Sequence, residues 1–242
     1  MKDVAYDIIY HYEKTHWWYR VRRELVNKLL FAETKKWSRS LQILDIGCGT
    51  GLLMKEMQGY GTVEGIDISE KAVAYCRERG LNPKVASADA LPFHDNSFDV
   101  AIILDVLEHL QDDKKGIEEL YRVLVAGGKA IVAVPAFMFL WSVTDELSNH
   151  YRRYTKKEIV ERFQAAGFNI QYVSYFNTFL FLPILLVRRM VKFFRIPMKS
   201  ENTIGGLFIN SILYGIFSWE ADLLPHITFP FGVSVLIIAR KK

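Results

Sequence analysis

The chain has 242 residues, of which 50% are hydrophobic and 24% charged, and its net charge is +4. This length is enough for one sizeable core, so we expect a single domain with one insertion. The two cysteines, Cys48 and Cys76, exclude a disulfide framework, and no Cys/His cluster in the sequence indicates a metal site. We therefore expect no metal and a reducing, cytoplasmic location.

Neither a secretory signal nor a membrane span is expected. The first 13 residues mix charged and aromatic side chains and lack the apolar centre of a signal peptide. The longest apolar run, Phe179–Val187, contains Pro183 and ends at two arginines. It falls well short of the ~20 residues that a membrane-spanning helix needs.

Short β-branched runs alternate with helical patterns, which is typical of a parallel sheet with crossover helices. Strands are expected at Leu41–Ile46, Thr62–Ile66, Pro83–Ala86, Phe98–Leu104, Lys129–Val134, Asn169–Phe176 and Val233–Arg240. Helices are expected near Leu52–Gln58, Glu70–Arg79, Lys114–Val125 and Lys156–Ala166, and turns at Gly47–Gly51, Ala126–Gly128 and Pro230–Gly232. This order predicts an α/β fold.

A glycine-rich turn follows the first of these strands. Gly47, Gly49 and Gly51 let the backbone pass close to a ligand. A dinucleotide fingerprint would place its third glycine at Leu52 instead, so the spacing argues against an NAD-linked oxidoreductase.

Two carboxylates follow at the ends of the next strands. Asp67 stands roughly 20 residues after the glycine turn, where a carboxylate can accept hydrogen bonds from both ribose hydroxyls of a nucleotide-like ligand. Asp89 can accept from an adenine amino group, while Ala90 and Leu91 cover the ring. Taken singly, each carboxylate could be a helix cap or a loop residue. Their order and spacing together favour a binding site.

The sequence Asp45-x-Gly47-x-Gly49-x-Gly51, Asp67, Asp89, Phe98-Asp99-Val100 and Asp105-Val-Leu-Glu108-His109 resembles the successive motifs of class I S-adenosylmethionine-dependent methyltransferases, type 11/12-like, over Leu41–Phe168. The resemblance implies a Rossmann-like fold with a mostly parallel seven-stranded sheet, an antiparallel last strand, helices on both faces and a helical C-terminal insertion. It implies S-adenosyl-L-methionine as cofactor and S-adenosyl-L-homocysteine as product. The cofactor-binding residues that it implies are Asp45, Gly47, Cys48, Gly49, Gly51, Asp67, Ile68, Asp89, Ala90, Leu104 and Asp105.

Methyl transfer from a sulfonium mainly requires that acceptor, methyl and sulfur be aligned and water excluded. A hydroxyl or acidic carbon acceptor would also need a general base, for which His150 and His109 are the candidates. His109 could equally pack against the helix that follows. Arg152 and Arg153 could bind an anion beside His150, or could pair with Asp145 and Glu146.

The N-terminal segment, residues 1–40, is expected to be a helical lid. Trp17, Tyr19 and Arg20 would close over the acceptor and exclude water. The alternative is a helix that docks by its aromatic face and contacts no ligand.

The remaining boundaries are a cofactor-binding core at 41–176, an apolar helical insertion at 177–231 and a final strand of the core sheet at 232–242. Within the insertion, Phe179–Ile196 sets apolar side chains against basic ones, and a second apolar helix is expected at Leu207–Leu224. These helices could lie at the inner face of a membrane or line a pocket for a long-chain acceptor. They could also pack on the sheet or form a homodimer interface.

The expected function is methyl transfer to a small, amphiphilic or lipid-like acceptor, with a hydroxyl oxygen ahead of carbon or nitrogen. No nucleic acid is expected as partner, because no binding module for one is present. The alternative is a methyltransferase-like fold without catalysis that binds a membrane surface or a protein partner.

Overall fold

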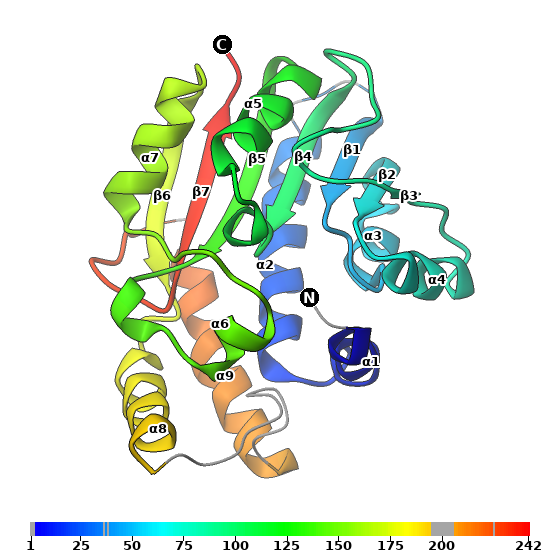
Figure 1. Ribbon diagram of the computed structural model, residues 1–242. Coiled ribbons are helices and arrows are strands. Elements are labelled where there is room, and N and C mark those ends of the chain that lie inside the picture. Colours follow the sequence, from blue (N-terminus) through cyan, green and yellow to red (C-terminus); the bar gives the residue numbers. More distant parts are fainter. Residues whose placement is uncertain (1–2, 36, 38, 195–205, 225) are drawn as a thin grey trace.

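The computed structural model describes residues 3–35, 37, 39–194, 206–224 and 226–242. These residues form a seven-stranded sheet with the order β3-β2-β1-β4-β5-β7-β6 (Figure 1). The strands are β1 (Leu41–Ile46), β2 (Gly61–Asp67), β3 (Lys84–Val85), β4 (Phe98–Leu104), β5 (Leu124–Pro135), β6 (Asn169–Phe176) and β7 (Ser234–Arg240). The pairs from β3 to β5 are parallel, and β7 is antiparallel to both of its neighbours. The predicted fold class is confirmed.

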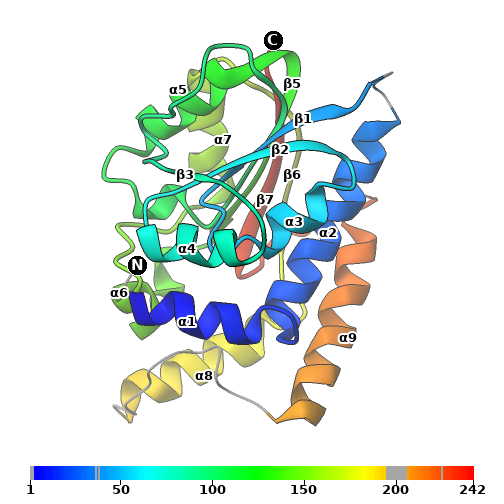
Figure 2. The same cartoon turned by 90° about the vertical axis from the view of Figure 1, so that its right-hand side faces the viewer.

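Helices cover both faces of the sheet. The helices α5 (Asp113–Val123) and α7 (Lys156–Ala165) lie on one face, and α2 (Trp17–Thr34) lies on the other, with α9 (Leu207–Leu223) outside it (Figure 2). The other helical elements are α1 (Asp3–Tyr12), α3 (Leu52–Met57), α4 (Glu70–Glu78), η1 (Leu107–His109), η2 (Met138–Leu140), α6 (Val143–Leu147) and α8 (Phe181–Phe193).

The sheet centre is the core. All of β4 except Leu104 at its end is buried, and β1 is buried except at Gln42, which is half-buried. A central parallel strand is covered on both faces, so it needs a continuous apolar run rather than an alternating one. This explains why β1 and β4 could be predicted to the residue.

Local capping fixes the starts of the helices. The hydroxyl of Ser69 accepts a hydrogen bond from the Ala72 N–H at 3.3 Å at the start of α4. At the start of α7, Thr155 and Glu158 form a reciprocal capping box. Such short-range signals can be recognised in a sequence, and both predicted starts are confirmed.

One predicted turn is wrong. Ala126–Gly128 lies inside β5, and α5 ends already at Val123. Gly127 has φ +79°, which lets the strand bend there, and the pairing of β4 with β5 shifts register between Phe98 and Val100. Glycine within a strand often marks a bulge or a tight bend.

The direction in which strands are added reverses at β1, with β2 and β3 on one side of it and β4 and β5 on the other. In open α/β sheets, ligands bind outside the carboxyl ends of the strands at this reversal. At this end of the sheet lie α1, α6 and α8, together with the N-terminal half of α2 (Figures 1 and 2).

Candidate active site

A large cavity of about 1040 Å³ opens at the carboxyl ends of β1, β2 and β4. It extends from the glycine-rich turn after β1 to the helices of the C-terminal insertion. Its walls include residues from α1 and α2, from the segment around α6, and from α8 and α9. One continuous space therefore adjoins both the predicted cofactor residues and the predicted acceptor residues.

Asp67 organises one end of this cavity. Its carboxylate accepts hydrogen bonds from the N–H groups of Gly49 and Ser69, each at 2.9 Å. The hydroxyl of Tyr6 in α1 donates to the same carboxylate at 3.1 Å. Burial raises the pKa of Asp67, and these donors oppose that rise. The carboxylate is thus fixed in orientation and faces the cavity.

Asp45 lies beside it, near the end of β1. Its side chain is buried, and Oδ2 has no hydrogen-bond partner among the described residues. Burial, and then the charge of Asp67, raise the pKa of Asp45 to about 7. A buried acceptor without a donor is costly, so a ligand that donates there would be stabilised.

The glycine turn leaves room for that ligand. Gly47 has φ +75°, and a Cβ at this position would lie 2.3 Å from the Val106 side chain. Gly49 has φ +54°, and a Cβ there would meet nothing within 4 Å. Gly47 is therefore needed for the close approach of two loops, while Gly49 borders open space.

A group of titratable side chains lies at the other end of the cavity. Glu108 and His109 are in η1 after β4, and His150 follows α6. The rings of His109 and His150 meet edge to face with their centres 4.5 Å apart. Burial and the neighbouring His150 lower the pKa of His109 to about 3.

His150 is oriented by a buried ion pair. Its Nδ1 lies 2.8 Å from Oδ1 of Asp145, which also accepts from Nε of Arg153 at 2.8 Å. Burial of Asp145 opposes its ionisation, but the hydrogen bond with His150 and the charge of Arg153 outweigh it and lower the pKa of Asp145. Asp145 is therefore ionised, and Nδ1 of His150 carries the proton of that hydrogen bond.

Glu108 is a fully buried carboxylate of this group. It is 0% exposed. Burial, and then the charge of Asp105, raise its pKa well above the ordinary value. Asp105 itself pairs with Arg22 of α2 at 2.7 Å.

The C-terminal helices supply an apolar wall. Pro183 and Ile184 of α8 and Leu213 of α9 line the cavity. Glu220 of α9 holds the start of α8 by accepting from the Thr178 N–H at 2.8 Å. Pro183 lies in the first turn of α8, where a proline is tolerated, so it does not interrupt the helix.

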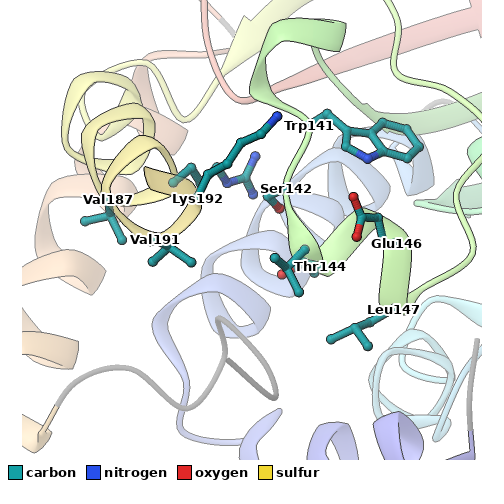
Figure 3. A pocket seen from close by; sticks show the side chains of 10 residues that line it. Trp141, Ser142, Thr144, Glu146, Leu147, Val187, Val191 and Lys192 are labelled. Atoms are coloured by element: carbon teal, nitrogen blue, oxygen red, sulfur yellow. The ribbon is translucent and has the colours of Figure 1, made fainter. Parts of the chain in front are cut away.

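A smaller cavity of about 80 Å³ separates α8 from the segment around α6. Figure 3 shows Val187 and Val191 of α8 on one side of it and Thr144 and Leu147 of α6 on the other. Val187, Thr144 and Leu147 also border the large cavity. These three side chains therefore lie between the two cavities and border both.

Among the described residues, no helix has the length and apolar character needed to cross a membrane. Instead, α8 has an exposed apolar stripe. Leu182, Leu186 and Met190 are 63%, 61% and 55% exposed and recur every four residues along one side of the helix. Arg195, Ile196 and Lys199, which the sequence analysis placed in the same segment, lie outside the described residues.

Comparison with known proteins identifies the domain. Residues 44–132 match the family model described as a methyltransferase domain. Three relatives match about half of this chain. An uncharacterized protein of Methanocaldococcus jannaschii is 34% identical over 52% of this chain and 63% of its own length. A demethylmenaquinone methyltransferase of Thermus thermophilus is 35% identical over 46% and 60%. A ubiquinone biosynthesis O-methyltransferase of Thiobacillus denitrificans is 34% identical over 42% and 47%.

The matches therefore span less than two thirds of the length of these relatives. Two solved structures agree over most of the chain. The (4+2)-cyclase SpnF is 24% identical with a TM-score of 0.58, covering 89% of this chain and 80% of that one. An S-adenosylmethionine-dependent methyltransferase of Thermotoga maritima is 18% identical with a TM-score of 0.58, covering 98% and 95%. At these identities the likeness shows the fold.

Residues 44–132 of the chain are thus identified as a methyltransferase domain. The cofactor of this domain family is S-adenosylmethionine, as the resemblance implied. The residues present fit it, because Asp45 offers an unpartnered buried acceptor and Gly49 borders open space.

Most of the cofactor residues predicted for the methyltransferase domain line the large cavity. They are Asp45, Gly47, Cys48, Gly49, Asp67, Ile68, Leu104 and Asp105. Gly51, Asp89 and Ala90 are not among its lining residues. Gly51 begins α3 with φ +82°, and a Cβ there would lie 2.7 Å from Sγ of Cys76, so its role is in packing. Asp89 and Ala90 follow Ala88, the last residue of their loop that borders the cavity.

Two predicted substrate arginines are directed elsewhere. Arg20 stacks on the Tyr214 ring of α9, with its guanidinium carbon 3.9 Å from the ring centre. Arg152 pairs with Asp113 at 3.2 Å. Arg153 borders the cavity but forms a bidentate pair with Asp145, so the alternative that it pairs with Asp145 is confirmed. Arg152 and Arg153 thus pair with Asp113 and Asp145, two carboxylates of the same chain.

The N-terminal helices do reach the methyltransferase site. Trp17 and Tyr19 border the cavity, as predicted for a lid. Tyr6 and Arg22 also contact site carboxylates, which sequence reasoning missed because nothing in α1 or α2 distinguishes them from the other aromatic and basic residues of these helices. Glu108 was within the recognised motif but had not been assigned a role.

Proposed function

We propose that the protein transfers a methyl group from S-adenosylmethionine to a small lipid-like acceptor. The observation that carries this proposal is the single cavity that begins at Asp67 and the glycine turn and continues to the apolar wall of α8 and α9. A methyltransferase needs its cofactor and acceptor in one water-poor space, because the displacement is in-line.

The cofactor would occupy the end at β1 and β2. Asp67 would accept from the ribose hydroxyls, Asp45 and the Gly49 backbone would hold the methionine portion, and Ile68 would cover the adenine. Asp89, beyond the cavity wall, remains a prediction for the adenine amino group. The bound cofactor supplies an activated methyl on a positively charged sulfur.

The acceptor would lie between the cofactor and the insertion. His109 and His150 stand at the end of the cavity where an acceptor hydroxyl must lose its proton, and Asp145 fixes the ring of His150. We propose that the acceptor is activated through these two histidines. Trp17 and Tyr19, which border the same space, would exclude water as parts of a lid formed by residues 1–40.

Two features support a lipid-like acceptor. Pro183, Ile184 and Leu213 give the cavity an apolar side. Two of the relatives are named for quinone metabolism, a demethylmenaquinone methyltransferase and a ubiquinone biosynthesis O-methyltransferase. An aromatic head group with an apolar tail fits a cavity that combines titratable groups at one end with aliphatic side chains at the other.

We further propose that α8 rests on a membrane surface. Its exposed stripe of Leu182, Leu186 and Met190 adjoins the exposed basic side chains of Arg189 and Lys192. An apolar stripe flanked by cations suits an anionic bilayer, and the acceptor could then enter the cavity beside α8. A homodimer formed through the same helices is the competing arrangement.

The test is formation of S-adenosylhomocysteine with two acceptors that share one aromatic diol head group. One carries an isoprenoid tail and the other a methyl group in its place. We expect kcat/KM to be at least 10-fold higher for the tailed acceptor, since several buried methylenes at ~0.8 kcal/mol each contribute. Substituting Ile184→Asp should remove this preference while leaving the short acceptor unaffected.

Equal rates with both acceptors, in wild type and variant, would refute the lipid-like acceptor. Cofactor binding without turnover would favour the alternative of a non-catalytic module that binds a membrane surface or partner. The fold permits a function other than methyl transfer, because a (4+2)-cyclase, SpnF, shares it.

A further inference from the structure

Glu108 is a buried carboxylate that the fold leaves unsatisfied. It is 0% exposed, and neither of its oxygens accepts a hydrogen bond from another residue in the described ranges. A buried carboxylate normally has donors or a cation beside it, because its desolvation is otherwise uncompensated.

The two nearby arginines are engaged elsewhere. Arg22 pairs with Asp105 at 2.7 Å, and Arg153 pairs with Asp145 at 2.8 Å. Each of these cations thus has its own carboxylate. Burial and the charge of Asp105 keep the pKa of Glu108 raised despite these two arginines, so the described side chains do not stabilise its ionised form.

Two imidazoles face this carboxylate. One ligand atom from each of Glu108, His109 and His150 lies within 4.8 Å of the other two. Nε2 of His150 is 4.0 Å from Oε1 of Glu108. Because Nδ1 of His150 donates to Asp145, its Nε2 keeps a free lone pair on the side of Glu108.

The outer contacts of both histidines are those of metal ligands. A metal-binding imidazole usually gives its second ring N–H to a carboxylate or a backbone carbonyl. His150 has Asp145 in that place at 2.8 Å, and His109 has a hydrogen bond with the backbone of Ser148. Asp145 is in turn held by Arg153, so the orientation is fixed before any ion arrives.

We propose that Glu108, His109 and His150 form a binding site for a divalent transition-metal cation. Two nitrogen ligands and one oxygen ligand favour ions such as Zn²⁺ and Mn²⁺ over Mg²⁺ or Ca²⁺, which prefer oxygen ligands throughout. Ligand atoms at ~2.1 Å from a shared tetrahedral ion are ~3.4 Å apart, so the three side chains, whose ligand atoms lie within 4.8 Å of one another, must close by up to about 1.4 Å.

The cation would face the acceptor end of the cavity, which all three residues border. Its role there rests on the proposed methyl transfer: His109 and His150 would activate the acceptor through the cation and not by accepting its proton themselves, since a Lewis acid stabilises negative charge that develops on an acceptor oxygen. The sequence predicted no metal, so the proposed cation site differs from that prediction. His150 is 41 residues from His109, so no ligand spacing in the sequence could indicate the group.

The test is titration of the chelator-treated, full-length protein with ZnCl₂, MnCl₂ and MgCl₂ separately by calorimetry. We expect one Zn²⁺ and one Mn²⁺ per chain with micromolar or tighter affinity, and at least 10-fold weaker Mg²⁺ binding. The variants Glu108→Gln, His109→Gln and His150→Gln should each weaken Zn²⁺ binding at least 10-fold. His94→Gln, on an exposed loop, is the control and should bind as wild type does.

A second measurement covers variants that fold poorly. Zn²⁺ should raise the thermal unfolding midpoint of wild type but not of Glu108→Gln, because only a protein that retains the site gains from binding. Equal Zn²⁺ affinity in wild type and all three variants, or no stoichiometric binding, would overturn the inference. Methyl transfer that is insensitive to chelator would refute the Lewis-acid role of the cation. S-adenosylmethionine binding is titrated separately, and cation binding without cofactor binding would refute the proposed function alone.

Discussion

The hydroxyl of Tyr6 donates a hydrogen bond to Oδ1 of Asp67 at 3.1 Å, although 61 positions separate the two residues. The helix α1 is thereby tied to the carboxylate that we expect to hold the ribose of the cofactor. Burial, together with the charge of Asp67, raises the pKa of Tyr6, so the phenol keeps its proton at neutral pH. Cofactor binding and the position of α1 should therefore affect each other.

Substituting Asp67→Ala should weaken S-adenosylmethionine binding about 100-fold, because hydrogen bonds to a charged group contribute ~1.5–3 kcal/mol each. Calorimetric titration measures this loss, with Glu161→Ala on the exposed side of α7 as control. Tyr6→Phe should change affinity by less than 10-fold but should expose α1 to proteolysis. Equal losses in the Asp67 and Tyr6 variants would show that α1, rather than the carboxylate, determines affinity.

Two glycines of one turn should respond differently to alanine. Gly51→Ala places a Cβ 2.7 Å from Sγ of Cys76 and 2.9 Å from Leu81, at φ +82°. We expect it to lower the free energy of unfolding by about 2–4 kcal/mol. Gly49→Ala meets nothing within 4 Å and should cost about 1 kcal/mol, but it should weaken cofactor binding. Urea denaturation and calorimetry separate the two effects, and similar stability losses would contradict the assignment.

Asp45 should make stability depend on pH. Its pKa is raised from 3.8 to about 7 in the folded protein, so the folded state retains a proton that the unfolded state loses. The free energy of unfolding should therefore fall as pH rises from 3.8 to about 7, and this group should add no further change above that. The upper bound is roughly 4 kcal/mol. Asp45→Asn should abolish this part of the profile and be more stable than wild type at pH 8, as measured by urea denaturation across pH.

Breaking the pair between Arg153 and Asp145 should destabilise the fold. Both side chains are buried, and Arg153→Met would leave the Asp145 charge without its cation, at a cost of about 3–5 kcal/mol. The lowered pKa of Asp145 stabilises the folded protein above the unfolded pKa of 3.8, and this contribution is lost as pH falls. The variant should show a smaller acid-dependent loss. The double variant Arg153→Met/Asp145→Asn should recover part of the stability, and a loss below 1 kcal/mol in the single variant would refute this account.

The proposed membrane contact of α8 predicts binding to vesicles. Leu186→Glu places a charge in the middle of the exposed stripe and should reduce sedimentation with vesicles containing anionic lipid at least 10-fold. Gln164→Glu on α7 adds the same charge to another exposed surface and serves as the matched control. Unchanged vesicle binding, with a shift from dimer to monomer in solution, would favour the homodimer instead.

The sheet could be predicted from the sequence because its central strands are continuous aliphatic runs and its helices begin at recognisable caps. The cofactor motif was likewise local, since Asp45, Gly47 and Gly49 are close in sequence and Asp67 follows at the end of the next strand. The acceptor end could be predicted only in part, because it joins η1, the segment after α6 and α2. His109, His150, Trp17 and Tyr19 were predicted there, but their contacts were not. The neighbours of Arg22 and Glu108 are determined by how these elements pack together. Such packing leaves no periodic pattern in the sequence.

The position of β7 has a consequence for biogenesis. This strand lies between β5 and β6, yet among the seven strands of the described sheet it is synthesised last, after α8 and α9. Until Ser234–Arg240 leaves the ribosome, β5 has an open edge and β6 lacks its sheet neighbour. Open edges of this kind recruit other strands. Nascent chains stalled within α9 should therefore be strong clients of chaperones, and shortening the chain by its last strand should produce aggregates rather than a smaller folded domain.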